Sequence, residues 1–186
     1  MSSFDFINTP LMDLKVILRK KLEDHRGYLS RFYCADEFIS AGVNKTIAQI
    51  NHTLTKAKGT IRGLHFQYLP YTEVKLVSCL KGEIWDVAVD LRCNSPTFLQ
   101  WHGEILTADN CKSLLIPEGF AHGFQTLSQD CELIYLHTEK YQSESEGALN
   151  VLDPSLNIDW PLPIGELSDR DRKHPFIDKT FQGLTL

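Results

Sequence analysis

The sequence predicts an all-β sandwich or barrel with a few short helices, formed by a single domain over residues 1–186. Short segments of alternating apolar and polar residues recur along the chain, with turn residues between them. Segment 59–67 is a strand-like run that carries a histidine beside a small-residue bend, and segment 116–124 is predicted to be a second histidine-bearing turn. The residues between them have strand rather than helix patterns. A chain of 186 residues can bury one core and is short for two. Together these features predict a small barrel whose mouth gathers histidines.

Eight segments have the length and composition of strands. In chain order they are residues 16–18, 28–33, 46–51, 73–80, 83–91, 101–106, 113–116 and 131–138. The segment 83–91 alternates most clearly. Its apolar face carries Trp85, Val87, Val89 and Leu91, and its opposite face carries Asp86, Ala88 and Asp90.

One short helix is predicted over residues 36–42, with Asp36 as its N-terminal cap and Gly42 as its stop. After Tyr141 the pattern changes, because residues 142–147 are polar and prolines follow. The segment 142–186 nevertheless keeps apolar side chains such as Leu156 and Trp160. We therefore expect it to pack along the barrel and to return polar residues to the barrel mouth.

Composition excludes several classes of partner. The net charge of −5 comes without a basic patch, which argues against nucleic-acid binding. No apolar run approaches membrane-spanning length, so we expect no membrane partner. The five cysteines are widely spaced and form no Cys-x-x-Cys pair, which favours reduced, buried thiols in a cytoplasmic protein.

The segment from Pro117 to His122 has the order Pro-x-Gly-x-x-His, which resembles the second sequence box of the cupin superfamily. The first cupin box carries His-x-His, whereas this chain has only His65 there, followed by Phe66 and Gln67. Metal-binding cupins need at least three protein ligands. His65 and His122, with Glu73 or Gln67, would be the candidates in a metal-dependent enzyme such as a dioxygenase or isomerase.

A more specific resemblance covers most of the chain in the same order. The matching segments are GTIRGLHFQ (59–67), KLVSCLKGEIWDVAVDLRCNSPTF (75–98), LLIPEGFAHGFQTLS (114–128), ELIYLHTEKY (132–141), SEG (145–147), IDWPL (158–162) and LSDRD (167–171). The chain resembles the dTDP-4-dehydrorhamnose 3,5-epimerase family. This implies a cupin-type jelly-roll barrel, no metal, no cofactor, and a nucleotide-diphosphate keto sugar as substrate. It also implies a homodimer that exchanges N-terminal strands.

The implied reaction inverts carbons next to a ketone, which requires a base, an acid on the opposite face and groups that hold the enolate. By resemblance, His65 is the base and Asp171 orients its ring. Tyr135 is the acid, and its alternation with Leu133 and His137 would point it inward. Tyr141 is a second candidate for the same cavity.

Two cations, Arg62 and Lys75, are implied to stabilise the oxyanion or to bind the diphosphate. Strict strand alternation places Arg62 and His65 on opposite faces. Only a bulge or bend at Gly63 would bring both to one site, so a bulge there is part of the prediction.

The remaining substrate contacts implied by the family pattern are Arg26, Gln49, Asn51, His122, Glu146 and Arg170. The family usually carries Glu where this chain has Arg31, and a guanidinium there would favour a different nucleotide or an extra phosphate. Open alternatives are therefore a CDP- or GDP-activated sugar, epimerisation at C3 or C5 alone, and a sugar-binding protein without catalysis.

Overall fold

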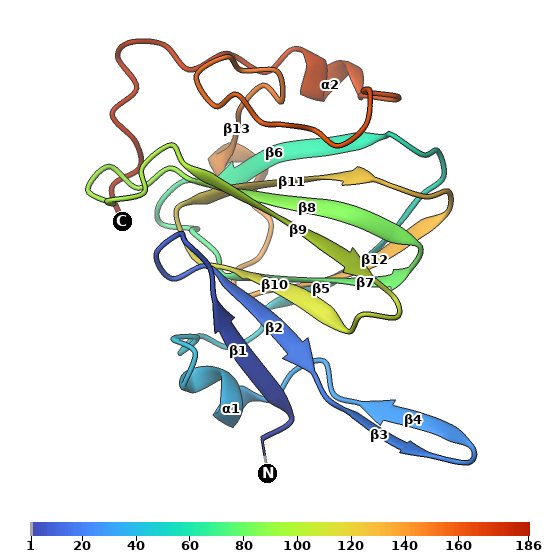
Figure 1. Cartoon of the computed structure of the whole chain (residues 1–186). Coiled ribbons are helices and arrows are strands. Elements are labelled where there is room, and N and C mark those ends of the chain that lie inside the picture. Colours follow the sequence, from blue (N-terminus) through green and yellow to red (C-terminus); the bar gives the residue numbers. More distant parts are fainter. Residues whose placement is uncertain (1) are drawn as a thin grey trace.

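Two antiparallel sheets face each other and enclose the core in the computed structural model, which describes residues 2–186 (Figure 1). The six-stranded sheet has the order β1 (Phe4–Asn8), β2 (Lys15–Arg19), β10 (Lys112–Ile116), β7 (Lys75–Lys81), β12 (Cys131–His137) and β5 (Gln49–Thr55). The five-stranded sheet has the order β13 (Glu146–Ala148), β6 (Ile61–Gln67), β11 (Phe120–Thr126), β8 (Glu83–Asp90) and β9 (Trp101–Thr107). The all-β prediction is confirmed.

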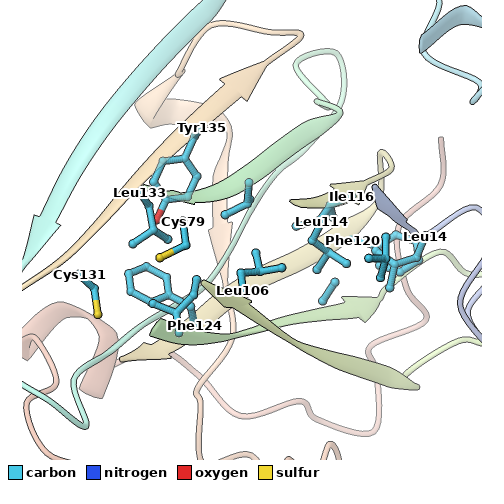
Figure 2. Packing of buried hydrophobic residues seen from close by; sticks show 14 of the residues in the cluster. Leu14, Cys79, Leu106, Leu114, Ile116, Phe120, Phe124, Cys131, Leu133 and Tyr135 are labelled. Carbon is cyan, nitrogen blue, oxygen red and sulfur yellow. The ribbon is translucent and has the colours of Figure 1, made fainter. Parts of the chain in front are cut away.

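Both faces of the five-stranded sheet are buried, and β8 shows why. Its Ile84 and Ala88 face the core between the sheets, while Trp85, Val87 and Val89 enter a second apolar cluster on the outer side. This is the alternation predicted from the sequence. The core between the sheets also holds side chains from β9 to β12, as Figure 2 shows for Leu106, Leu114, Phe124 and Leu133.

The C-terminal segment covers the outer face of the five-stranded sheet. Its Leu149, Leu156 and Leu167 complete the second apolar cluster. Helix α2 (Asp169–Arg172) then lies along β6 at one end of the barrel (Figure 1). Ser168 caps this helix, since its Oγ accepts a hydrogen bond from the backbone N–H of Asp171 at 3.0 Å. This hydrogen bond fixes the backbone position of Asp171, from which its side chain extends.

The N-terminal region lies on the opposite side of the molecule. Helix α1 (Ala35–Ile39) packs its buried Phe38 against Phe4 on the six-stranded sheet. Strands β3 (Lys21–Asp24) and β4 (Gly27–Ser30) form a hairpin that projects away from the barrel (Figure 1). In residues 2–186, no helix combines the length and hydropathy needed to cross a bilayer.

Three local predictions were wrong. Helix α1 begins after Cys34, so Asp36 lies in its first turn and does not cap it. The predicted strand 28–33 ends at Ser30. His122 lies inside strand β11, not in a turn, because the turn before it ends at Gly119. Strands β1, β3 and β13, all of them short, and the longer β11 were not predicted.

Gly63 forms the predicted bulge in β6. His65 pairs with His122 and Arg62 pairs with Phe124, so two residues of β6 stand opposite Gly123 alone. Gly63 has φ +134°, which favours glycine, and the extra residue brings Arg62 and His65 to one cavity. The bulge therefore determines which side chains reach the site.

We predict that Gly63→Ala destabilises the fold by about 2–4 kcal/mol and displaces His65. An added Cβ would lie 2.5 Å from Gly123 Cα and 2.9 Å from the His122 carbonyl oxygen, both backbone atoms. Gly42→Ala is the matched control, because Gly42 also has positive φ (+95°) but nothing within 4 Å of the added Cβ. It should cost only about 1 kcal/mol. Urea unfolding measures both, and equal losses would contradict the prediction.

Candidate active site

A cavity of about 840 Å³ opens at the end of the barrel beside α2. Side chains from both sheets and from the C-terminal segment line it. Those from the strands include Asn51, Thr53, Arg62, His65, Lys75, His122, Phe124, Tyr135 and His137; those from the C-terminal segment include Glu166, Ser168, Arg170, Asp171 and Arg172. A second cavity of about 310 Å³ adjoins it and shares Asn51, His65, Lys75 and His137.

His65 and Asp171 form a hydrogen-bonded pair in this cavity, with Nε2 of His65 2.7 Å from Oδ1 of Asp171. Burial, the largest single effect, would raise the pKa of the Asp171 carboxyl, but the hydrogen bonds from His65 and Ser168 and the nearby rings of His65 and His174 together lower that pKa. An ionised carboxylate only accepts hydrogen bonds, so Nε2 of His65 carries the proton. Nδ1 of His65 then keeps a lone pair that can act as a base.

Tyr135 lies across the cavity on β12 and is 8% exposed. Its ring stacks on His137 with centroids 6.0 Å apart and meets His122 edge to face at 6.1 Å. Figure 2 shows its hydroxyl directed into the barrel, on the side of Leu133 and Cys79. Burial, with Asp86 adding to it, raises the pKa of Tyr135 well above its ordinary value. The phenol therefore stays protonated at neutral pH, as an acid requires.

His122 pairs with Asp86 on the neighbouring strand β8, with Nε2 2.7 Å from Oδ1. Both side chains are almost completely buried. Burial lowers the pKa of His122 despite the nearby carboxylate, which favours a neutral imidazole. A neutral ring that donates from Nε2 leaves Nδ1 free to accept a hydrogen bond.

Lys75, Glu73 and His137 form a three-membered ionic group on the cavity wall. Glu73 lies 3.2 Å from Lys75 Nζ and 2.7 Å from His137 Nδ1. Burial alone would raise the pKa of Glu73, but Lys75 and His137 lower it to about 2. Lys75 is itself 8% exposed, so its ammonium is held at the wall and not in solvent.

Three arginines line the same cavity. Arg62 donates from Nε to Thr55 Oγ1 at 3.0 Å, and Arg172 donates to the carbonyl of Leu167 at 3.4 Å. Arg170 forms an ion pair with Glu146. The chain is acidic overall, yet the lining of this cavity is rich in guanidinium groups. Such a lining is suited to a diphosphate.

The other predicted contacts fall into two groups. Gln49, Tyr141 and Glu146 line the adjoining cavity, where the Tyr141 hydroxyl donates to Glu146 at 2.9 Å. Arg26 and Arg31 line neither cavity of their own chain. Arg26 sits at the hairpin tip with Asp24, and Arg31 bonds to Ser3 Oγ at 2.9 Å.

The alternative metal set does not match the structure. The Gln67 amide is engaged by the backbone of Tyr71, Lys140 and Gln142. Glu73 is held by Lys75 and His137, as described above. His65 and His122 each bond to a different carboxylate. The four predicted ligands therefore do not converge.

Comparison with known proteins identifies the family. The family model described as dTDP-4-dehydrorhamnose 3,5-epimerase matches residues 8–179. The dTDP-4-dehydrorhamnose 3,5-epimerase of Salmonella typhimurium is 42% identical over 175 residues, which cover 93% of this chain and 95% of the relative. The chain belongs to the dTDP-4-dehydrorhamnose 3,5-epimerase family.

Solved structures of this family have the same fold. The Bacillus anthracis epimerase, solved with TDP and PPi bound, superposes with a TM-score of 0.90 at 40% identity, covering 94% of this chain and 99% of that one. The Legionella pneumophila epimerase, solved with dTDP-4-keto-L-rhamnose, gives 0.89 at 42% identity, covering 93% and 92%. The predicted family and its cupin-type fold are thereby confirmed.

Two features of this epimerase-family site were missed at the sequence level, although each had a signal. Asp86 sits on the inward face of an apolar strand, where a carboxylate needs a partner, and that partner is His122. His137 shares a strand face with Tyr135 and so had to reach the same cavity. Arg172 had no such signal, since it follows Asp171 in a short helix of the irregular C-terminal segment.

We predict that Glu73→Gln lowers stability in a pH-dependent way. The folded-state pKa of Glu73 lies below its ordinary value, so its carboxylate stabilises the fold above about pH 4.5, and this stabilisation is lost as pH falls through about 2. Glu73→Gln should therefore lower the free energy of unfolding by about 3 kcal/mol at pH 7 and by about half that at pH 3. Urea unfolding at both pH values measures it.

Glu144→Gln is the control, because Glu144 is exposed in a turn of the C-terminal segment. It should change stability by less than about 0.5 kcal/mol at either pH. If Glu73→Gln lowers the free energy of unfolding by the same amount at pH 7 and pH 3, the assignment of Glu73 as a buried, paired carboxylate is contradicted.

Proposed function

We propose that this protein epimerises a dTDP-4-keto-6-deoxyhexose at C3 and C5, with His65 and Asp171 as the base and Tyr135 as the acid. The observation that carries the proposal is the hydrogen-bonded His65–Asp171 pair in one cavity with a buried, protonated Tyr135. Membership of the epimerase family supplies the substrate class.

The chemistry follows from the two protonation states. Nδ1 of His65 takes the proton from a carbon next to the C4 ketone, and the electron pair moves onto the ketone oxygen as an enolate. Asp171 stabilises the imidazolium that forms. Tyr135 then gives its proton to the opposite face of that carbon while the enolate returns to a ketone. The configuration is inverted, and proton exchange with solvent returns His65 and Tyr135 to their starting states before a second carbon reacts.

The cations of the cavity divide between two tasks. Lys75 lines the same cavity as His65 and Tyr135, and we assign it to the enolate oxygen. Arg62, Arg170 and Arg172 are assigned to the diphosphate, which guanidinium groups can bind in bidentate fashion. His122 would accept a hydrogen bond from a sugar hydroxyl through Nδ1.

Assembly as a homodimer is a further part of the proposal. The hairpin β3–β4 projects from its own barrel, and its cross-strand pair Leu22 and Leu29 is 70% and 63% exposed. Large apolar side chains exposed together are typical of an interface. Exchange of N-terminal strands would bring Arg26 and Arg31 to the partner's cavity, where Arg31 could contact the nucleotide.

We predict that His65→Ala and Tyr135→Phe separate the two proton transfers. With dTDP-4-keto-6-deoxyglucose in heavy water, the wild type should incorporate deuterium at both C3 and C5, as followed by NMR. His65→Ala should lower both deuterium entry and product formation by about 10³-fold. Tyr135→Phe should lower product formation by about 10²-fold while deuterium still enters from the His65 face.

His52→Ala is the control, since His52 is exposed on β5 beside Glu132 and does not line the cavity. It should leave both rates unchanged. Label at one carbon alone would restrict the proposal to a single-centre epimerase. Absence of deuterium label with any 4-keto nucleotide sugar would refute the proposed reaction. Tighter binding of CDP or GDP than of dTDP in isothermal titration calorimetry would refute the proposal that the substrate carries dTDP.

We predict that the protein sediments at twice its chain mass of 21.2 kDa and that Leu22→Asp with Leu29→Asp dissociates it. Two carboxylates in an apolar interface would be desolvated without partners. Leu152→Asp is the matched control, because Leu152 is 56% exposed on the C-terminal segment. Analytical ultracentrifugation gives the mass, and a monomeric wild type would rule out the dimer.

A further inference from the structure

A third side chain, His174, approaches the His65–Asp171 pair from outside the cavity. Its Nε2 lies 3.3 Å from Oδ1 of Asp171, the same oxygen that bonds to His65. The two imidazole rings meet edge to face with centroids 5.7 Å apart. His174 follows α2 and does not line the cavity that holds His65 and Asp171. The carboxylate of Asp171 is thus shared by two imidazoles, of which the epimerisation uses one.

The ring nitrogen of His174 that faces this oxygen is not satisfied. Nε2 of His174 is buried from solvent and forms no hydrogen bond, because its approach to Asp171 lacks hydrogen-bonding geometry. A buried ring nitrogen without a partner is unfavourable. A metal ion that accepts the lone pair of Nε2 would remove that cost.

The three groups have the geometry of a metal site. One ligand atom from each of His65, Asp171 and His174 lies within 4.8 Å of the other two. Bonds of about 2.0–2.2 Å to Zn²⁺ in a tetrahedral arrangement place neighbouring ligand atoms about 3.3 Å apart. The His174–Asp171 separation already has this value, and the His65–Asp171 pair would open from its 2.7 Å hydrogen bond. Two imidazoles and one carboxylate leave the fourth position open toward the cavity.

We propose that His65, Asp171 and His174 bind one Zn²⁺ ion per chain and that its binding reversibly inhibits the enzyme. Zn²⁺ replaces the proton that Nε2 of His65 shares with Asp171. A neutral imidazole that coordinates through Nε2 carries its proton on Nδ1, so Nδ1 has no lone pair left for the substrate. The inhibition, though not the binding, rests on the proposed function. Imidazole and carboxylate ligands favour Zn²⁺ over Mg²⁺, which prefers an all-oxygen octahedral site.

Isothermal titration with ZnCl₂ at pH 7.5 tests the binding without reference to catalysis. The wild type should bind one ion per chain, and Mg²⁺ should give no saturable signal. His174→Ala and His174→Phe should each bind Zn²⁺ at least about tenfold more weakly, because one of three ligands is lost. His174→Phe keeps a ring in the space, and thermal unfolding of both variants checks the fold. His25→Ala, at the exposed hairpin tip, is the matched control and should bind as the wild type does.

Activity provides the second arm. Zn²⁺ should inhibit the wild type and His25→Ala, EDTA should reverse this, and the His174 variants should resist it. Without metal, the His174 variants should keep their rate within about threefold, since His174 does not reach the cavity. Unchanged Zn²⁺ binding in both His174 variants, or none in the wild type, overturns the proposal; an inactive protein that binds one Zn²⁺ overturns only the function.

Discussion

The hydrogen bond between His65 and Asp171 joins residues 106 positions apart and links the C-terminal segment to the barrel at the candidate active site. His65 comes from the bulged strand β6, and Asp171 comes from a short helix capped by Ser168. Each end of the bond is therefore fixed by its own backbone. The side chains are held in place before any substrate binds, which is the condition for efficient proton transfer.

Three histidines of this cavity are each paired with a carboxylate. His65 with Asp171, His122 with Asp86 and His137 with Glu73 are each 2.7 Å pairs. In each pair the carboxylate supplies an acceptor that an apolar barrel lacks, and the ring orientation is fixed as a result. The pairs differ in exposure, because the His65 side chain is 33% exposed while that of His122 is 6% exposed. The more open ring of His65 exchanges protons with solvent more readily than the ring of His122.

The barrel is predictable from the amino-acid sequence because alternation and turn chemistry are local properties, whereas the roles of the site residues were implied by the family resemblance. Strand β8 is the clearest case, since the alternation of its residues assigns both of its faces correctly. The bulge at Gly63 was also predictable, because two side chains needed on one side were an odd number of residues apart. The Asp36 cap was predicted wrongly because burial of Phe38, a tertiary effect, sets where α1 begins. The contact of His174 with Asp171 follows from how the C-terminal segment folds back, and no local pattern carries that information.

A cavity that inverts a carbon must hold opposite protonation states on its two walls, and this structure achieves that through unequal surroundings. On one wall, an ionised carboxylate holds His65 in the tautomer that leaves Nδ1 unprotonated. On the other, burial keeps the Tyr135 phenol protonated, and nearby Asp86 opposes its ionisation further. The same low dielectric makes a developing enolate costly unless a cation is close, and Glu73 holds the Lys75 ammonium at the wall of this cavity. Base, acid and cation thus line one cavity, where a carboxylate orients His65, burial reinforces the protonation of Tyr135 and an ion pair positions Lys75.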